Sequence, residues 1–470
     1  MVYCWSLELL NAGVGRVDIT PPVGVAHAGW GAQTHQVSVG NDMPLLVTAI
    51  VVSKDDLDLA IVDVDIGIFT GDQDRKIRDL ITAESGIPFA NIRLSYSHTH
   101  SGPITFGQWI KEGIDLANEW WDQIPKACAE AVSLAKNSQQ LARSGFGRGS
   151  CPVNINRRPA RDGGDLFTGR NWDGFVDHDV DVVGIDDIDG DPIATIVNYA
   201  MHPTIMGHEN QWVTPDFPGP MRSVVEHAVG GICLFLQGAS GNQGPVDGFT
   251  GDLKTYRKAG SRLGAEAARV RLGIDPVKRE ERLDEILVSG ADLGIYTDIP
   301  VEESDDTVAV QNITVDLPSR RVATIDEAQA AFDQGEKELA EARASQLSEV
   351  ELQRAVSKVM RANVYLNVAK NYEIYDQGGY IPMNIQAMRI GETTLVSVPV
   401  EPFAELALAI KERSTADNTV FSGFSNGHYA YLPTDIAYEE GGYEVGVSPF
   451  APGSAGLTVE ACLEAVEDLQ

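Results

Sequence analysis

Two apolar runs near the N-terminus decide how this chain folds: residues 44–65 read PLLVTAIVVSKDDLDLAIVDVD. The runs 44–52 and 59–65 are rich in Val, Ile and Leu, the composition of strands that are buried on both faces. Helical stretches at about 117–136 and 253–272 alternate with such runs, which predicts α/β layering. Further strands of the same kind are expected at 91–96, 180–186, 193–199 and 230–236.

The second half of the chain contains two helix-start signals. Thr324 with a Glu three residues later, and Ser348 likewise, form capping-box patterns that satisfy free helix N–H groups. They predict a helical hairpin of residues 324–344 and 348–370. The other elements expected here are short strands and turns over 276–315, strands at 384–390, 393–398 and 419–424, a helix from Pro402 to about Glu412, and a structured loop from Asn426.

Composition limits the kinds of partner. The 470 residues are 43% hydrophobic and 22% charged, typical of a globular chain with a sizeable core. We expect one domain over 1–470, because the candidate site residues discussed below come from both halves of the chain. The predicted fold is α/β, with mixed layered sheets, flanking helices and the helical hairpin at about 324–370 as an insertion. The net charge of −32 repels phosphate backbones and anionic headgroups. We therefore expect a small-molecule substrate, no nucleic acid and no stable membrane association, while the oligomeric state stays open.

Cysteines and termini bear on the compartment. The five cysteines are widely spaced and form no CxxC pair, so neither a disulfide framework nor a cysteine zinc site is expected. The start, MVYCWSLELLNAG, lacks the basic segment and the apolar run of a signal peptide. The sequence contains no run of 18 apolar residues, so no transmembrane helix is expected. These features favour a cytoplasmic protein.

Three histidines and a glutamate follow predicted strands, at the ends where α/β sheets bind ligands. His98 and His100 lie in SYSHTHSGP, where a strand period of two would place both rings on one face. His202 lies in NYAMHPTIMGH, and Glu401 lies in LVSVPVEPFAEL. A lone HxH fits a structural role as well as a metal site. Glu401 by itself fits a role at a helix N-terminus.

The C-terminal segment HYAYLPTDIAYEEGGYEVG is rich in tyrosine. Such segments usually pack through their rings as lids or interfaces. A phenol that binds zinc must lose or share a proton of pKa about 10, which a nearby cation makes easier. His208, six residues after His202, is interpreted as a surface or loop histidine.

Six segments stand in this order along the chain: GVGRVDITPP (13–22), HTHSGP (98–103), NINRRP (154–159), NYAMHPT (198–204), VEPFAEL (400–406) and the spacing from Tyr431 to Tyr443. Together they resemble the neutral (non-lysosomal) ceramidase family in its catalytic domain. The sequence departs from the family at Gly244, where the family has a serine. We also expect neither the family's secretory leader nor its C-terminal immunoglobulin-like domain.

The resemblance implies the family's fold, one zinc ion and hydrolysis of an N-acyl bond. Two neutral imidazoles with a carboxylate suit zinc, and no serine nucleophile is needed when zinc activates water. The residues that the resemblance assigns are, as zinc ligands, His98, His202, Glu401 and Tyr431, and, as the acid/base and the groups facing the scissile carbonyl, His100, Arg157 and Tyr443.

Three functions remain open at this point. The first is a zinc-dependent amidohydrolase that cleaves an N-acyl linkage through zinc-activated water. The second is a zinc esterase or other hydrolase of a small soluble polar metabolite, and the third is a non-catalytic protein with a structural zinc closed by four ligands. Ceramide itself is expected to be a poor substrate, because the net charge of −32 opposes approach to anionic bilayers. Phe106 and Trp109 are expected to wall a pocket for a small ring or short acyl group.

Overall fold

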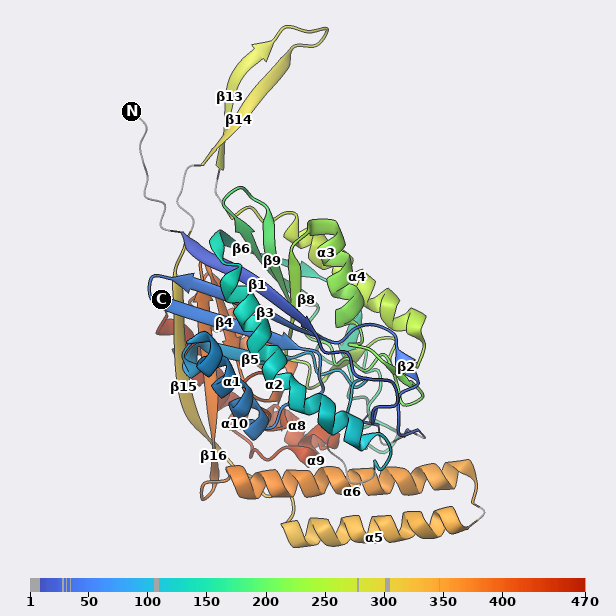
Figure 1. Ribbon diagram of the computed structural model, residues 1–470. Coiled ribbons are helices and arrows are strands. Elements are labelled where there is room, and N and C mark those ends of the chain that lie inside the picture. The colour runs from blue at the N-terminus through green and yellow to red at the C-terminus, as the bar shows by residue number, and fades with distance from the viewer. Residues whose placement is uncertain are drawn as a thin grey trace.

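The computed structural model describes residues 9–469 except for 28, 31, 34, 105–109, 277–278, 301–304 and 346. It is a mixed α/β structure of four layers: helices, an eight-stranded sheet, a four-stranded sheet and further helices (Figure 1). The layered fold predicted from the sequence is confirmed. The predicted pocket residues Phe106 and Trp109 lie outside the described residues.

The large sheet contains the strands predicted in the first half, each within two residues of its expected bounds, together with β1 and β6. Its strand order is β11-β9-β8-β6-β1-β3-β4-β5, with β4/β5 and β9/β11 parallel and the other pairs antiparallel. The strands are β1 (Leu10–Asp18), β3 (Leu46–Lys54), β4 (Leu57–Val64), β5 (Ile92–Tyr96), β6 (Gln140–Ser150), β8 (Asp179–Asp187), β9 (Pro192–Tyr199) and β11 (Ile232–Gln237).

Both faces of the large sheet are covered, which explains its continuous apolar runs. Val51 of β3 packs under the helices α1 (Gly71–Ser85) and α2 (Ile114–Asn137), whereas its neighbour Ile50 faces the second sheet. The helices α3 (Pro218–Val229) and α4 (Leu253–Arg271) cover the part of the sheet that contains β8, β9 and β11.

The first motif, GVGRVDITPP, has a packing reason for its glycines. A Cβ atom on Gly13 would lie 2.1 Å from the carbonyl oxygen of Ala135, and one on Gly15 would lie 2.1 Å from that of Ala131. Both carbonyls belong to α2. The helix therefore rests directly on the backbone of β1, and any side chain at these positions would push it away.

The second sheet has the order β15-β16-β17-β19. One face packs on the large sheet through Met388, Leu395 and Val420. The other face is covered by α7 (Ala404–Arg413) and α10 (Ser454–Glu467). The strands are β15 (Val308–Pro318), β16 (Tyr380–Ile390), β17 (Thr393–Ser397) and β19 (Asn418–Ser422).

Two expectations for the C-terminal part are wrong. The segment from Asn426 is not a structured loop throughout, because α10 follows it and buries Val459, Cys462 and Val466, spaced three and four residues apart. The helix expected from Pro402 begins at Ala404 instead. Glu401 and Pro402 form a short strand.

The remaining short elements are β2 (Gly40–Asn41), β7 (Asn154–Asn156), β10 (Trp212–Val213), β12 (Gln243–Pro245), β18 (Glu401–Pro402), β20 (Tyr431–Leu432), η1 (Phe89–Asn91), α8 (Asp435–Glu440) and α9 (Tyr443–Val447).

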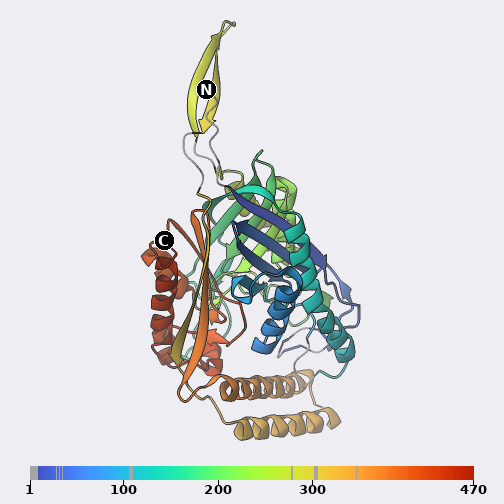
Figure 2. The same cartoon turned by 60° about the vertical axis from the view of Figure 1, so that its left-hand side comes forward.

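Two hairpins extend from the layered body (Figure 2). The predicted helical hairpin is confirmed as α5 (Ile325–Ala344) and α6 (Glu349–Tyr375), each begun by its capping box. At the other end of the molecule, β13 (Arg279–Leu287) and β14 (Leu293–Pro300) form a projecting two-stranded hairpin. Among the described residues, no helix combines the length and the apolar character needed to span a membrane.

The large sheet is curled, and the curl positions the functional site. The edge strands β5 and β11 lie against each other although they end the strand order on opposite sides. Buried charge joins the two edges: Asp63 of β4 accepts from Phe235 of β11 and pairs with Arg222 of α3 at 3.2 Å. Because β9 is the parallel neighbour of β11, the C-terminal ends of β5 and β9 come close to each other.

Candidate metal centre and active site

Two buried histidines from strands near opposite edges of the curled sheet face each other. The Nε2 atoms of His98, after β5, and His202, after β9, lie 3.1 Å apart. Nδ1 of His98 lies 2.6 Å from the carbonyl oxygen of Gly67, and Nδ1 of His202 lies 3.2 Å from that of Ser240. A carbonyl oxygen only accepts, so each Nδ1 donates and each Nε2 holds a lone pair. Two facing lone pairs repel, and a cation bound to both relieves that repulsion.

A carboxylate and a phenol complete this side of the site. The short strands β18 and β20 are parallel, with Glu401 in register with Tyr431. Oε2 of Glu401 lies 3.6 Å from Nε2 of His98 and 3.8 Å from Nε2 of His202. This oxygen is buried and has no hydrogen-bond partner among the described residues. Burial raises the pKa of Glu401 to about 7, despite the opposing effects of Tyr431 and Arg157.

His100 is the third histidine of the cluster. In the described chain, one group of His, Cys, Asp or Glu side chains could hold a metal ion, and it consists of His98, His100 and His202, whose ligand atoms lie within 4.8 Å of one another. Burial and the charge of Arg157 lower the pKa of His100 to about 4. Its Nε2 has no hydrogen-bond partner in the described structure. The geometry thus allows His100 to bind a metal ion or to exchange a proton beside it.

The sequence argument for the HxH pair needs a correction. The strand β5 ends at Tyr96, so both histidines lie beyond it. His98 has a φ of 64°, the left-handed region, which turns the backbone between the strand and His100. The two rings are therefore brought together by a turn, with centroids 5.0 Å apart, and not by the period of a strand.

The other side of the site is an arginine–glutamate network. Nη2 of Arg157 donates to the Tyr431 hydroxyl at 3.1 Å, and Nε donates to Glu444 at 3.0 Å. Arg158 donates to the second oxygen of Glu444 at 2.6 Å. The ring of Tyr443 lies 5.8 Å from that of Tyr431 and is 49% exposed, so it borders the open side. All the site residues named from the sequence therefore meet at one place.

The sequence analysis did not identify two residues that lie at the candidate site, Glu444 and His428. Glu444 follows Tyr443 directly and holds both arginines. His428 lies three residues before Tyr431; its Nε2 is 3.7 Å from Glu401 and its Nδ1 is 2.9 Å from the Tyr96 hydroxyl. Their position beside the two predicted tyrosines was the available signal. His208, read as a surface residue, is not part of the cluster of metal-ligand atoms.

Gly244 occupies the position where the family has a serine. It lies on β12, paired with β7, and a Cβ atom there would lie 3.2 Å from the Cβ of Arg157. The nearby Ser240 contributes a different group. Its carbonyl oxygen faces His202, while its hydroxyl accepts a hydrogen bond from Gln237 at 2.6 Å.

The donor set fits a zinc ion. Imidazole nitrogens and carboxylate oxygens are ordinary zinc ligands, and Oε2 of Glu401 and Nε2 of His100 have no hydrogen-bond partner among the described residues. His98 and His202 are each oriented by a backbone carbonyl through the other ring nitrogen, the arrangement that fixes the tautomer in metal sites.

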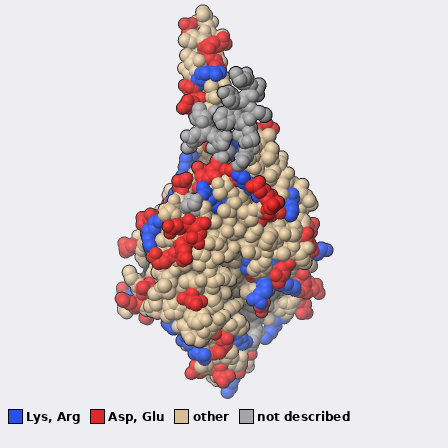
Figure 3. All heavy atoms as spheres, turned by 90° about the vertical axis from the view of Figure 1, so that its left-hand side faces the viewer, with Lys and Arg blue, Asp and Glu red and all other residues tan. Residues whose placement is uncertain are grey.

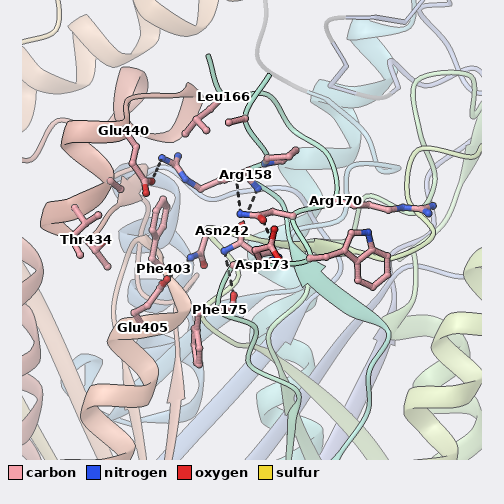
Figure 4. Close-up of a pocket in the computed structure, with 18 of the residues that line it drawn as sticks. Arg158, Leu166, Arg170, Asp173, Phe175, Asn242, Phe403, Glu405, Thr434 and Glu440 are labelled. Carbon is pink, nitrogen blue, oxygen red and sulfur yellow. Dashed lines mark hydrogen bonds and ion pairs between the residues drawn. The ribbon is translucent and has the colours of Figure 1, made fainter. Parts of the chain in front are cut away.

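A hollow of about 890 Å³ lies next to the site (Figure 4). Its lining includes Asn156 and Arg158, which flank Arg157, and Phe403 and Glu405, which follow Glu401. Its lining contains none of the four predicted ligands. The hollow therefore borders the segments that carry Arg157 and Glu401.

Known proteins are similar to this chain in sequence and in fold. The model of the family "Neutral/alkaline non-lysosomal ceramidase, N-terminal" matches residues 10–249. Neutral ceramidase B of Dictyostelium discoideum is 33% identical over 187 residues, 35% of this chain and 26% of that protein. Neutral ceramidase of Pseudomonas aeruginosa is 24% identical over 393 residues, 77% of this chain and 57% of that protein. The matches thus span only part of the length of these relatives.

The crystal structure of neutral ceramidase from Pseudomonas aeruginosa has the same fold. It superposes with a TM-score of 0.68 at 19% identity and covers 98% of this chain and 74% of that chain. The family match extends over half of the chain and includes His98, His100, Arg157, His202 and Gly244. The chain therefore belongs to the neutral/alkaline non-lysosomal ceramidase family.

Proposed function

We propose that this protein is a zinc-dependent amidohydrolase that cleaves an N-acyl linkage. The observation that carries the proposal is the pair of Nε2 lone pairs of His98 and His202, 3.1 Å apart, beside the partnerless Oε2 of Glu401. Family membership supports a hydrolase, because the relatives are named ceramidases. When bound, zinc would supply a water molecule of lowered pKa and would polarise a carbonyl group.

The proposed ligands are His98, His202, Glu401 and Tyr431. The two histidines are already oriented, because their Nδ1 atoms face the carbonyl oxygens of separate loops. Burial and the charge of Glu401 raise the pKa of Tyr431, whereas Arg157, which donates a hydrogen bond to the hydroxyl, acts in the opposite direction. A bound cation would act in the same direction as Arg157. Preorganisation of this kind lets the site bind a cation without rearranging the chain.

The residues on the open side handle the substrate. Arg157 is held by Glu444 and Tyr431, so its guanidinium is a fixed donor beside the cluster. Together with the half-exposed Tyr443, it would stabilise the negative charge that develops on the carbonyl oxygen. His100 is only partly buried, and its Nε2 lacks a partner. It would carry the proton to the leaving nitrogen.

The proposed substrates are soluble N-acyl compounds with a compact acyl or sugar-like part. The net charge of −32 opposes contact with anionic bilayers, so we still expect ceramide to be turned over poorly. An ester linkage at the same site is the alternative, because the chemistry of carbonyl attack is shared.

A hydrolysis panel tests the proposal. The purified protein is stripped of metal and then assayed with no metal, with Zn²⁺ and with Mg²⁺ on ceramide micelles, N-acyl amino acids, acetylated sugars and lactones. We expect turnover of amides only after Zn²⁺ is restored, at one metal ion per chain. Full activity of the metal-free protein would contradict the metal, and turnover confined to lactones and esters would contradict the amide bond. Efficient turnover of ceramide alone would contradict the substrate class.

A further inference from the structure

The projecting hairpin β13–β14 is here called the arm (Arg279–Pro300). It is unusual because β13 packs on neither the sheets nor the helices of the layered body. Every described side chain of β13 is exposed. An isolated two-stranded hairpin is marginal in water and normally needs a further surface for stability. Figure 1 places the arm at one end of the molecule, away from α6, α8 and α9.

The outer half of the arm, residues 283–296, has apolar side chains on both faces of the hairpin. Strand pairing places Leu287, Leu293 and Ile295 on one face, and Leu283, Ile286 and Tyr296 on the other. Each of these side chains is at least 39% exposed, and Val288 at the tip is 94% exposed. A contiguous exposed apolar surface marks an interaction site. Because both faces are apolar, the partner must enclose the tip and not merely lie along one side.

The charge of the arm selects the kind of partner. The arm carries six acidic residues against Arg279 and Arg282, and its outer half, from Leu283 to Tyr296, carries Asp284, Glu285 and Asp292 without any Lys or Arg. Acidic groups along the arm are visible in Figure 3. Insertion into a bilayer would bury these carboxylates. A protein surface that joins an apolar groove to basic side chains fits better.

This chain carries such a surface itself. A groove of about 570 Å³ between α3 and α4 is lined by Met43, Pro220, Val224 and Ala228. On α4, Lys254, Lys258 and Arg262 recur at intervals of four residues and form one exposed basic stripe. The stripe adjoins Arg257 and Ser261, which line the groove, and two of its members, Lys258 and Arg262, also line a smaller hollow next to it on the same helix. None of the three has an ion-pair partner in the described part of the chain. In a protein of net charge −32, a basic stripe beside an apolar groove is a marked exception.

We propose that the arm is a self-association element whose tip docks into the α3–α4 groove of a second copy of this chain. The apolar tip fills the groove, and the carboxylates of the outer half face the basic stripe. At about 3.3 Å per residue, the nine-residue strand β13 reaches about 30 Å beyond the body, enough to cross to a neighbour. A reciprocal exchange of two arms closes a symmetric dimer, the commonest closed assembly.

Sedimentation velocity of the full chain over a micromolar concentration series tests the proposal. We expect a concentration-dependent dimer whose Kd rises about tenfold or more in the arm variant Leu287→Asp/Leu293→Asp and in the groove variant Ala228→Glu. The matched control is Ile374→Asp on α6, which is 70% exposed, lies outside both surfaces and should leave the dimer unchanged. Circular dichroism confirms that each variant is folded.

A charge exchange tests the docking surface separately. Reversal of the stripe (Lys254→Glu, Lys258→Glu and Arg262→Glu) should weaken the dimer, and the addition of Glu285→Lys and Asp292→Lys should restore it. A chain that is monomeric at every concentration overturns the proposal. So does a dimer that survives the groove and stripe variants, because the arm would then dock elsewhere. Binding of the chain to phosphatidylcholine vesicles that is lost in the arm variant also overturns it, since the arm would then be a membrane contact.

Discussion

The two sides of the site differ in how their polar groups are satisfied. On the arginine side, Glu444 bridges Arg157 and Arg158, so buried charges of both signs meet inside the protein. On the histidine side, Nε2 of His98 and His202 and Oε2 of Glu401 are acceptors that face one another without a donor. The polar groups of one side satisfy one another, whereas those of the other side would be satisfied by the proposed cation. This difference places the proposed metal-dependent hydrolysis on the histidine side of the site.

The largest expected effect comes from His98→Ala, which breaks the histidine side. We expect this variant to lose both bound zinc and hydrolysis, because one of two preoriented imidazoles is removed from a buried site. Metal content by inductively coupled plasma mass spectrometry and turnover are measured together. The control is His208→Ala, outside the cluster, which should keep both. Retention of one zinc per chain in His98→Ala would contradict the proposed ligand set.

His100→Ala separates proton transfer from metal binding on the same side. We expect zinc to be retained and the rate to fall by about 10²–10⁴-fold, the usual contribution of a general acid or base. The same two measurements decide the role. If zinc is lost together with activity, His100 is a ligand and the third member of the cluster, as its spacing from His98 and His202 also permits.

Glu444→Gln breaks the arginine side without touching the proposed ligands. The change keeps the shape but removes the carboxylate that pairs with Arg157 and leaves Arg158 only the half-exposed Glu440, so we expect a loss of about 3–5 kcal/mol in the free energy of unfolding. Denaturant titration measures it. Glu440→Gln is the matched control, because Glu440 also contacts Arg158 at 3.3 Å but its side chain is 50% exposed; its loss should be below about 1 kcal/mol. Equal losses in the free energy of unfolding for both variants would contradict the larger stabilising contribution expected of the buried Glu444 bridge.

The smallest effect is expected for Ser240→Ala. The group of Ser240 that faces His202 is the backbone carbonyl, which the substitution keeps, and the hydroxyl only accepts from Gln237. Turnover should stay within a few-fold of the parent. A loss comparable with that of His100→Ala would instead indicate a serine mechanism at Ser240, four residues before Gly244.

Much of the fold follows from local patterns in the sequence. Thr324 and Ser348 begin helices because a hydroxyl and a glutamate three residues later satisfy helix N–H groups wherever they occur. The apolar runs around Ile50 and Ile61 are strands because both their faces are buried. The helix α10 escaped this reasoning because Gly, Pro and Tyr dominate the segment before it.

The sequence by itself determined the candidate residues for the proposed chemistry, because imidazole, carboxylate and phenol groups are recognisable by type and by their family motifs. Only the tertiary structure decided how they meet. His98 and His202 come together because the large sheet curls until β5 touches β11. Glu401 reaches Tyr431 through a parallel bridge of two short strands. These contacts join residues far apart in the chain, and such contacts depend on the packing of whole layers and not on any local pattern.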